Sequence, residues 1–389
     1  MIDAERNEMH VIVDGIVYGF QRYGGINTYF IELLPRIARR HCVTVEMFLP
    51  RGVMGRTPSP PVRILRRDWL PTSTGLSWRL DQLLQTRLEN INVKLMDLQI
   101  RRKKRCVFQS SYFTWVNSSV PQVALAHDFN HELYPELYAD ERGRWLRRQC
   151  RDYLSHATRI IAVSERTKRD IVRFYGLDPS IIDVVYHATD RAVFYPCRDH
   201  TALALLRANT GLTSPYLLYV GGRWTYKNFR TLLEAFAQSS LKEKLILAVA
   251  GPAWSLSEVQ QLQELGLEAY VRLIPNPSDD DLRALYSFAS AFIYPSYHEG
   301  FGIPLLEAMA CGTLVLASDT EVFREVAGDA AMYFNPNNAT EMSRMLEAAL
   351  DEPTRQEYIA RGFDRVEQFS WDKCADQTYE VYEKALAAR

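Results

Sequence analysis

The chain has 389 residues with 47% hydrophobic content, and its formal net charge is −1. This length exceeds one compact core and predicts two domains, while the near-zero charge gives no global field for binding nucleic acid. The six cysteines form no CxxC pair, which argues against a zinc site or a disulfide framework and favours a reducing compartment. The sequence lacks a signal peptide and any apolar run of about 18 residues, so we expect a cytoplasmic globular protein.

Short apolar runs alternate with amphipathic segments through the first half of the chain. The runs that predict strands are 9–15, 43–50, 106–111, 122–128, 158–164 and 181–187. Helical spacing covers residues 26–40, and Ser164 predicts the N-cap of a helix that ends near Gly176. Alternation of this kind predicts a parallel sheet covered by helices.

A composition break at residues 191–204 separates this series from a second one. Further strands are predicted at 215–222, 244–252, 271–277, 291–296 and 313–318, with a helix at 229–238. We therefore predict an α/β protein with two doubly wound, Rossmann-like domains, residues 1–195 and 196–370, followed by a C-terminal helix over residues 371–389. Because ligands of such sheets bind outside the carboxyl ends of the strands, we expect the site in a cleft between the domains.

The segment PSYHEGFGIPLLEAMACG, residues 295–312, places Glu299 in a glycine-flanked loop and Glu307 about one turn into the next helix. Pro304 suits the first position of that helix, and the free N–H groups of residues 301–305, Pro304 excepted, predict an anion site that favours a diphosphate. Glu307 could then accept hydrogen bonds from a ribose diol, and Glu299 could reach the reacting group. The alternative is a helix-capping acid and an unrelated surface acid, which the glycine loop between them disfavours.

Other polar residues follow predicted strands. Arg223 and Lys227, after the glycine pair that ends with Gly222, could converge on phosphate oxygens, with two solvated loop cations as the alternative. The glycines of RYGGIN could let the backbone approach a ligand at a helix start, although a mere turn fits equally well. The His–Asp pair of ALAHDF could hold a sugar hydroxyl or a phosphate, with a structural histidine as the alternative.

Two charged segments have competing interpretations. Asp279–Asp281 form a DxD-like string, but acids at a helix start complement the helix dipole, so we expect a helix start and no metal. Residues 78–105 form a long amphipathic pattern that ends in five basic residues. We favour a surface helix with a solvated end, and a peripheral contact with anionic lipid is the alternative.

These motifs resemble those of the retaining GT-B glycosyltransferases, specifically the family four group (glycosyl transferases group 1). The specific part is the pair Glu299 and Glu307 within HEGFGIPLLEAMACG. YVGGRWTYKNFRTLLEAF, QRYGGINTYF, IIAVSERTKRDIVRFYG and VFREVAGDAAMYFNP also fit, so the resemblance covers nearly the whole chain. The family often has Asn-Gly near the end of its N-terminal domain, where this chain has His187-Ala188, and we assign no role to His187.

The resemblance implies transfer of a hexose from a nucleotide diphosphate sugar to a glycan or lipid-linked acceptor, with retained configuration, in surface polysaccharide or O-antigen biosynthesis. It implies a GT-B fold with an acceptor-binding N-terminal domain, a donor-binding C-terminal domain and a last helix that crosses back to the first. It also implies catalysis without a metal or cofactor. The YVGGR..YKN pattern favours mannose or a deoxyhexose, with GDP-mannose as donor, and the sequence does not indicate an oligomeric state.

The resemblance also assigns residue roles. The catalytic set is Glu299, His127, Arg223 and Lys227, and the binding set is Gly24, Gly25, Asp128, Gly222, Gly300, Phe301, Gly302, Ile303 and Glu307. Arg223, Lys227 and the amides near Gly302 would stabilise charge on the departing diphosphate. A same-face mechanism is favoured over double displacement. A nucleotide-sugar epimerase of the same architecture and a non-catalytic glycan-binding protein remain as alternatives.

Overall fold

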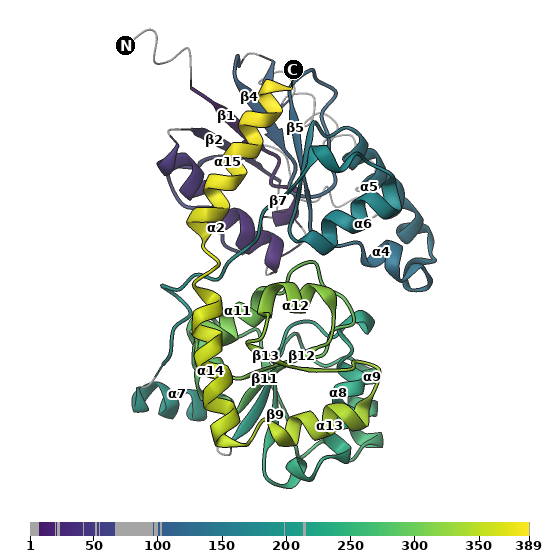
Figure 1. The fold of residues 1–389 in the computed structure, drawn as a ribbon, viewed down its shortest axis with the longest axis vertical. Helices are drawn as coiled ribbons and strands as arrows, with labels where there is room; N and C mark the ends of the chain where they lie inside the picture. Colours follow the sequence, from purple (N-terminus) through teal and green to yellow (C-terminus); the bar gives the residue numbers. More distant parts are fainter. Residues whose placement is uncertain are drawn as a thin grey trace, which may run out of the picture. The chain divides into compact units, whose positions relative to one another are not determined.

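The computed structural model describes residues 8–19, 21, 24–41, 43–50, 53, 55–66, 96, 100, 101, 103–197, 199–212 and 215–388. The chain divides into two compact units (Figure 1). The first joins Met1–His187 to Trp371–Arg389, and the second is Ala188–Ser370. The first boundary therefore falls inside the segment predicted as the N-terminal domain, and the last helix belongs to the first unit.

The first unit is built on a seven-stranded parallel sheet with the order β3-β2-β1-β4-β5-β6-β7. Its strands are β1 (His10–Val13), β2 (Thr44–Leu49), β3 (Arg63–Arg66), β4 (Cys106–Gln109), β5 (Gln122–Ala126), β6 (Arg159–Ala162) and β7 (Ile182–Val184). The central strands β4 and β5 are buried at every position, which explains their continuous apolar runs. The predicted strands are all present, and β3 was not predicted.

Helices cover this sheet (Figure 1). They are α2 (Gly25–Arg40), α4 (Asn130–Leu133), α5 (Glu141–Ser155), α6 (Glu165–Tyr175) and α15 (Trp371–Ala387), with short 3₁₀ turns at Ile16–Gly19, Pro135–Tyr138 and Pro179–Ile181. Ser164 caps α6 by accepting a hydrogen bond from the Thr167 N–H, and left-handed Gly176 ends it, as predicted. Helix α15 packs against α2 and the central strands β4, β5 and β6.

The second unit is built on a six-stranded parallel sheet with the order β10-β9-β8-β11-β12-β13. Its strands are β8 (Tyr216–Val220), β9 (Ile246–Gly251), β10 (Val271–Pro275), β11 (Ala291–Tyr294), β12 (Val315–Ser318) and β13 (Ala331–Phe334). The chain builds the sheet outward from β8 to β10 and then returns to place β11 on the other side of β8. This reversal makes a topological switch point between β8 and β11.

The helices of the second unit begin earlier than the composition break indicated. They are α7 (His200–Thr210), α8 (Phe229–Gln238), α9 (Leu256–Glu264), α10 (Asp279–Phe288), α11 (Ile303–Ala310), α12 (Glu321–Ala327), α13 (Ala339–Ala348) and α14 (Glu352–Val366), with 3₁₀ turns at Thr225–Lys227 and Ser240–Glu243. Helix α7 lies partly in the segment interpreted as a linker. Asp199 caps it by accepting from the Thr201 N–H, and left-handed Gly211 ends it.

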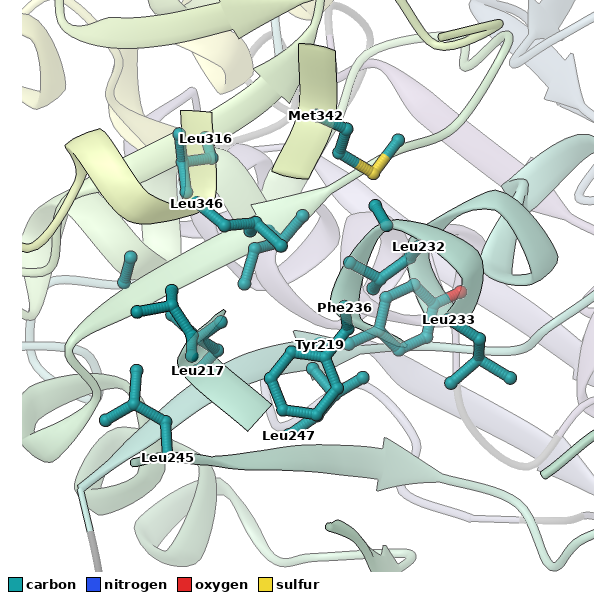
Figure 2. Close-up of a cluster of buried hydrophobic side chains, with 14 of the residues drawn as sticks. Leu217, Tyr219, Leu232, Leu233, Phe236, Leu245, Leu247, Leu316, Met342 and Leu346 are labelled. Carbon is teal, nitrogen blue, oxygen red and sulfur yellow. The ribbon is translucent and has the colours of Figure 1, made fainter. Parts of the chain in front are cut away.

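A dense apolar core holds α8 and α13 against one face of this sheet. Figure 2 shows β-strand side chains such as Leu217, Tyr219 and Leu247 meeting Phe236 of α8 and Leu346 of α13. All five are fully buried, and burial on this scale stabilises the unit by roughly 1.5–3 kcal/mol per large side chain. The core therefore gives the loops at the carboxyl ends of β8 and β11 a rigid base. In the described part of the chain, no helix combines the length and apolar character needed to cross a bilayer.

Candidate functional site

Two loops at neighbouring strand ends carry the predicted site residues of the second unit. Residues 221–228 follow β8, and residues 295–302 follow β11. The loops therefore flank the switch point, where open parallel sheets bind ligands. The Tyr297 N–H donates to the Tyr226 carbonyl over 2.8 Å and ties the two loops together.

Lys227 and Glu299, both predicted as catalytic, form an ion pair in the second unit. The Lys227 Nζ lies 2.6 Å from Glu299 Oε1 and 3.3 Å from the Tyr294 hydroxyl. The ammonium also lies 5.4 Å from the centroids of the Tyr226 and Tyr294 rings. Burial, and then the Glu299 charge, hold the pKa of Tyr294 well above its usual value, so its hydroxyl stays protonated. The structure thus places a charged, hydrogen-bonded pair where the reacting group was expected.

Arg223 does not converge with Lys227, contrary to the expectation from the sequence. Its Nε lies 2.6 Å from Glu258 Oε1, and its Nη2 donates to the carbonyls of Pro252 and Ala253 over 2.9 Å. The guanidinium also lies 4.4 Å from the centroid of the Trp254 ring, and the side chain is only 3% exposed. Arg223 turns toward the loop after β9 because a carboxylate, two carbonyl oxygens and an aromatic face lie there.

The start of α11 differs from the prediction in two details. Left-handed Gly302, with φ of 104°, is the N-cap, so Ile303 is the first helical residue and Pro304 the second. The Leu305 N–H donates to the Gly302 carbonyl over 3.0 Å, so this amide is not free. The side chains of Phe301 and Ile303 are buried, which leaves their backbone as the part that a ligand could contact.

Glu307 is partly buried on α11 and already has a partner. Its Oε2 accepts a hydrogen bond from the Tyr286 hydroxyl over 3.0 Å. Burial raises the pKa of Glu307 to about 7, although the Tyr286 hydrogen bond works in the opposite direction. Near neutral pH this acid is therefore partly protonated, a state that was not predicted from the sequence.

Four of the predicted residues lie in the first unit. Gly24 is the N-cap of α2 and Gly25 its first residue. His127 follows β5 and is half-buried, and its Nε2 is buried and has no hydrogen-bond partner among the described residues. Burial lowers the pKa of His127 to about 4, so the ring is neutral at pH 7. Asp128 accepts from the Asn130 N–H over 3.2 Å and so supports the start of α4.

Sequence reasoning missed the partners of the predicted residues. Glu258 holds Arg223, Tyr286 holds Glu307, and Tyr294 contacts Lys227. One signal was available: Ser255 and Glu258 have the Ser-x-x-Glu spacing of a capping box, and the structure forms that box at the start of α9. The two tyrosines appeared only as apolar positions of a helix and a strand, so no pattern distinguished them.

The DxD-like string lies in the first turn of α10, as predicted. Ser278 caps the helix, and Asp281 Oδ2 accepts from the Ser278 N–H over 3.1 Å and from its hydroxyl over 2.7 Å. Asp280 lies 3.3 Å from Arg283. Within the described residues, no three His, Cys, Asp or Glu side chains gather as a metal would require.

Most of the amphipathic segment 78–105 lies outside the described residues. At its basic end, Arg105 pairs with Glu383 over 2.7 Å, and the Lys103 Nζ lies 3.5 Å from Glu46. These two cations contact carboxylates of their own unit.

Comparison with known proteins gives consistent similarities. Family models match residues 23–193 (Glycosyltransferase Family 4) and residues 205–365 (Glycosyl transferases group 1). The O-antigen chain mannosyltransferase B of Escherichia coli is 32% identical over 368 residues, 92% of this chain and 95% of that protein. The O-antigen chain mannosyltransferase RfbU of Salmonella typhimurium is 29% identical over 252 residues, 64% of this chain and 67% of that protein. A solved sucrose-phosphate synthase from Thermosynechococcus elongatus matches 98% of this chain and 100% of its own, with a TM-score of 0.76 and 20% identity.

Proposed function

Because the chain belongs to the group 1 glycosyl transferases, with a family 4 N-terminal half, we propose that it moves a hexose from a nucleotide diphosphate sugar to a glycan or lipid-linked acceptor. Its two parallel sheets with covering helices have the GT-B architecture. The finer proposal is transfer of mannose from GDP-mannose in O-antigen biosynthesis. The two mannosyltransferase relatives support this choice of sugar and pathway.

The Lys227–Glu299 ion pair is the observation that carries this proposal. It joins the loop after β8 to the loop that leads into α11, at the switch point of the second sheet. A diphosphate at the start of α11 would meet the helix N-terminus and the Lys227 ammonium. Lys227 then exchanges a carboxylate for phosphate oxygens, and Glu299 is released to accept a hydrogen bond from a donor-sugar hydroxyl.

The proposed reaction retains the anomeric configuration by a same-face route. The bond from the anomeric carbon to the diphosphate breaks, the acceptor oxygen bonds to the same face, and its proton passes to the departing phosphate. Lys227 and the backbone amides near Gly302 stabilise the charge that builds on the diphosphate. Neutral His127 contacts the donor sugar or its phosphate, and Glu307 holds the ribose.

We propose that no metal takes part, because Asp280 and Asp281 are already engaged at the start of α10 and the family resemblance implies metal-independent transfer. The measurement is the transfer rate before and after treatment with EDTA, and the expected rate is unchanged. A loss of transfer that Mg²⁺ or Mn²⁺ restores would contradict this part of the proposal.

A screen of nucleotide sugars by thermal shift tests the donor. A ligand at 100 times its Kd should add about 2.7 kcal/mol to the free energy of unfolding. We expect GDP-mannose and GDP to stabilise the protein more than their UDP and ADP counterparts. Failure to bind any nucleoside diphosphate would refute the enzymatic function and favour a glycan-binding protein. Conversion of the donor to its epimer without acceptor would instead indicate an epimerase.

The transfer rate of the Glu299→Ala variant tests the proposed role of Glu299. We expect this variant to fold and to lose transfer, since the reacting sugar loses its carboxylate partner. Glu234→Ala is the matched control because Glu234 forms an ion pair with Arg230, whose side chain is 79% exposed. Transfer by Glu299→Ala at the wild-type rate would show that the proposed role is wrong.

We further propose that the reaction takes place in the cytoplasm at the inner face of the membrane, where a lipid-linked acceptor is available. The amphipathic pattern of residues 78–105, which ends in five basic residues, supports this location. Co-sedimentation with vesicles that contain anionic lipid tests it, with neutral vesicles as the control. Equal recovery with both kinds of vesicle would contradict an electrostatic contact.

A further inference from the structure

Trp224 is exposed on a loop whose backbone is firmly held. Trp224 is 63% exposed and lies on the loop that carries Lys227. The Tyr219 hydroxyl donates to the Gly222 carbonyl over 2.5 Å, and the Lys227 N–H donates to the Trp224 carbonyl over 2.8 Å. The indole is therefore held at the surface, where a ligand can reach it.

Asn228 fixes the far end of the same loop. Its Nδ2 donates to the carbonyls of Pro295 and Pro336 over 3.1 and 2.8 Å, and its backbone has a left-handed φ of 55°. The exposure of Trp224 therefore follows from the fixed backbone of this loop and not from a loosely held segment.

The neighbouring residues shape a platform of two rings. A Cβ at Gly222 would lie 2.6 Å from the indole ring of Trp224, so only glycine leaves room for the ring in this position. The indole stacks on Tyr226, with ring centroids 6.1 Å apart and planes inclined by 14°. Trp224 and Tyr226 are called the aromatic platform below.

The aromatic platform adjoins the ion pair but carries no charge. The Lys227 Nζ lies 5.4 Å from the centroid of Tyr226 and pairs with Glu299. Arg223, which precedes Trp224, is turned away to Glu258 and is 3% exposed in its side chain. The exposed indole is therefore suited to a neutral ligand, while the cation nearest to it is committed to the buried pair.

We propose that the aromatic platform binds a hexopyranose unit of the acceptor glycan; this rests on the proposed function and places one acceptor contact on the second unit, in addition to the acceptor-binding N-terminal domain that the resemblance implies. A pyranose presents weakly positive C–H groups on one face, which are attracted to the electron-rich face of an aromatic ring. The charged donor diphosphate has Lys227 and the start of α11 as partners. The neutral rings beside them can therefore bind a sugar of the acceptor. An exposed ring also suits a glycan that extends into solvent.

The first experiment detects the sugar without measuring transfer. The full chain is labelled with 5-fluorotryptophan, and the Trp224 signal is assigned as the one that Trp224→Phe lacks. Methyl α-D-mannopyranoside, the corresponding glucoside and galactoside, and an α-linked mannobiose are the probes. We expect the Trp224 signal to shift with at least one of them, while that of Trp145, which is 50% exposed in the first unit, stays in place.

The second experiment separates acceptor from donor. With GDP-mannose as donor and the mannobiose as acceptor, Trp224→Ala should raise the acceptor KM by about tenfold, the upper end of an aromatic stacking contribution. The kcat and the Kd of GDP should not change, and Trp224→Phe should recover most of the affinity.

Two results would overturn the proposal. One is a Trp224 signal that no sugar probe moves, and the other is a loss of GDP affinity in Trp224→Ala with an unchanged acceptor KM. A wild-type protein that binds no nucleoside diphosphate would refute the proposed function instead, and the sugar titration would still show whether the platform binds a hexopyranose.

Discussion

Lys227 and Glu299 are 72 residues apart in the sequence and only 2.6 Å apart between Nζ and Oε1. Their side chains are 13% and 11% exposed, so both charges lie largely out of water. Burying an ion pair costs desolvation free energy that its mutual attraction only partly offsets. A role in ligand binding therefore explains the Lys227–Glu299 pair better than a contribution to the stability of the fold.

Removing one member of this pair should be costly. Lys227→Met leaves the Glu299 carboxylate in place without its ammonium partner, and we expect a loss of about 2–3 kcal/mol in the free energy of unfolding. Urea denaturation of the variant and the wild type measures it. The double variant Lys227→Met, Glu299→Gln should lose less than the sum of the single losses, because it leaves no unpaired charge.

Arg230→Met is the matched control for this prediction. Arg230 pairs with Glu234 one turn along α8, but its side chain is 79% exposed, so the change should be within about 0.5 kcal/mol. Equal losses of unfolding free energy in Lys227→Met and Arg230→Met would show that burial does not increase the cost of breaking the Lys227–Glu299 pair.

Glu307 should make stability depend on pH. Its pKa is raised from an ordinary 4.5 to about 7, so the folded state binds more protons than the unfolded state between these values. The free energy of unfolding should therefore fall as pH rises from about 5 to about 8, by on the order of 2–3 kcal/mol from this group. Thermal unfolding across this pH range measures the effect.

Glu307→Gln supplies the control for the pH prediction. Glutamine can still accept a hydrogen bond from Tyr286 but cannot ionise, so the variant should match the wild type near pH 5 and exceed it near pH 8. Parallel pH profiles for the two proteins would contradict the raised pKa.

The Arg223–Glu258 ion pair should contribute more to stability than the N-cap of α9, in which Glu258 also takes part. Glu258→Ala removes the partner of a buried guanidinium, and we expect a loss of about 3 kcal/mol in the free energy of unfolding. Ser255→Ala removes the N-cap side chain of α9 but leaves the ion pair, and should cost about 1 kcal/mol. Urea denaturation of both variants decides, and a Glu258→Ala loss no larger than that of Ser255→Ala would be inconsistent with the buried ion pair.

Most of the strands and the two ends of α6 were predictable because their causes are local. Buried parallel strands need continuous apolar runs, and Ser164 and Gly176 mark the ends of α6 by their own backbone chemistry. Strand β3 was missed because its sequence, RILR, has a charge at both ends and lies at the sheet edge. Helix α7 was missed because it begins inside the segment whose composition was interpreted as a linker.

The partners in the site were not predictable because tertiary packing chooses them. The sequence showed that Arg223 and Lys227 follow a strand, yet one turns to Glu258 near β9 and the other to Glu299 after β11. Nothing local distinguishes these destinations. The pKa of Glu307 likewise depends on burial by the surrounding unit, which a single sequence does not reveal.

Trp371 should be essential to the first unit although it follows the whole second unit in the sequence. It is 3% exposed, and its ring lies 6.3 Å from Tyr29 of α2 and 5.8 Å from His187. Trp371→Ala should leave a cavity and lower the free energy of unfolding of this unit by about 3–5 kcal/mol. Amide hydrogen exchange in α2 reports the loss for this unit alone. Trp145→Ala, at a position 50% exposed on α5, should change it by less than about 1 kcal/mol, and equal effects would contradict the packing of α15 on α2.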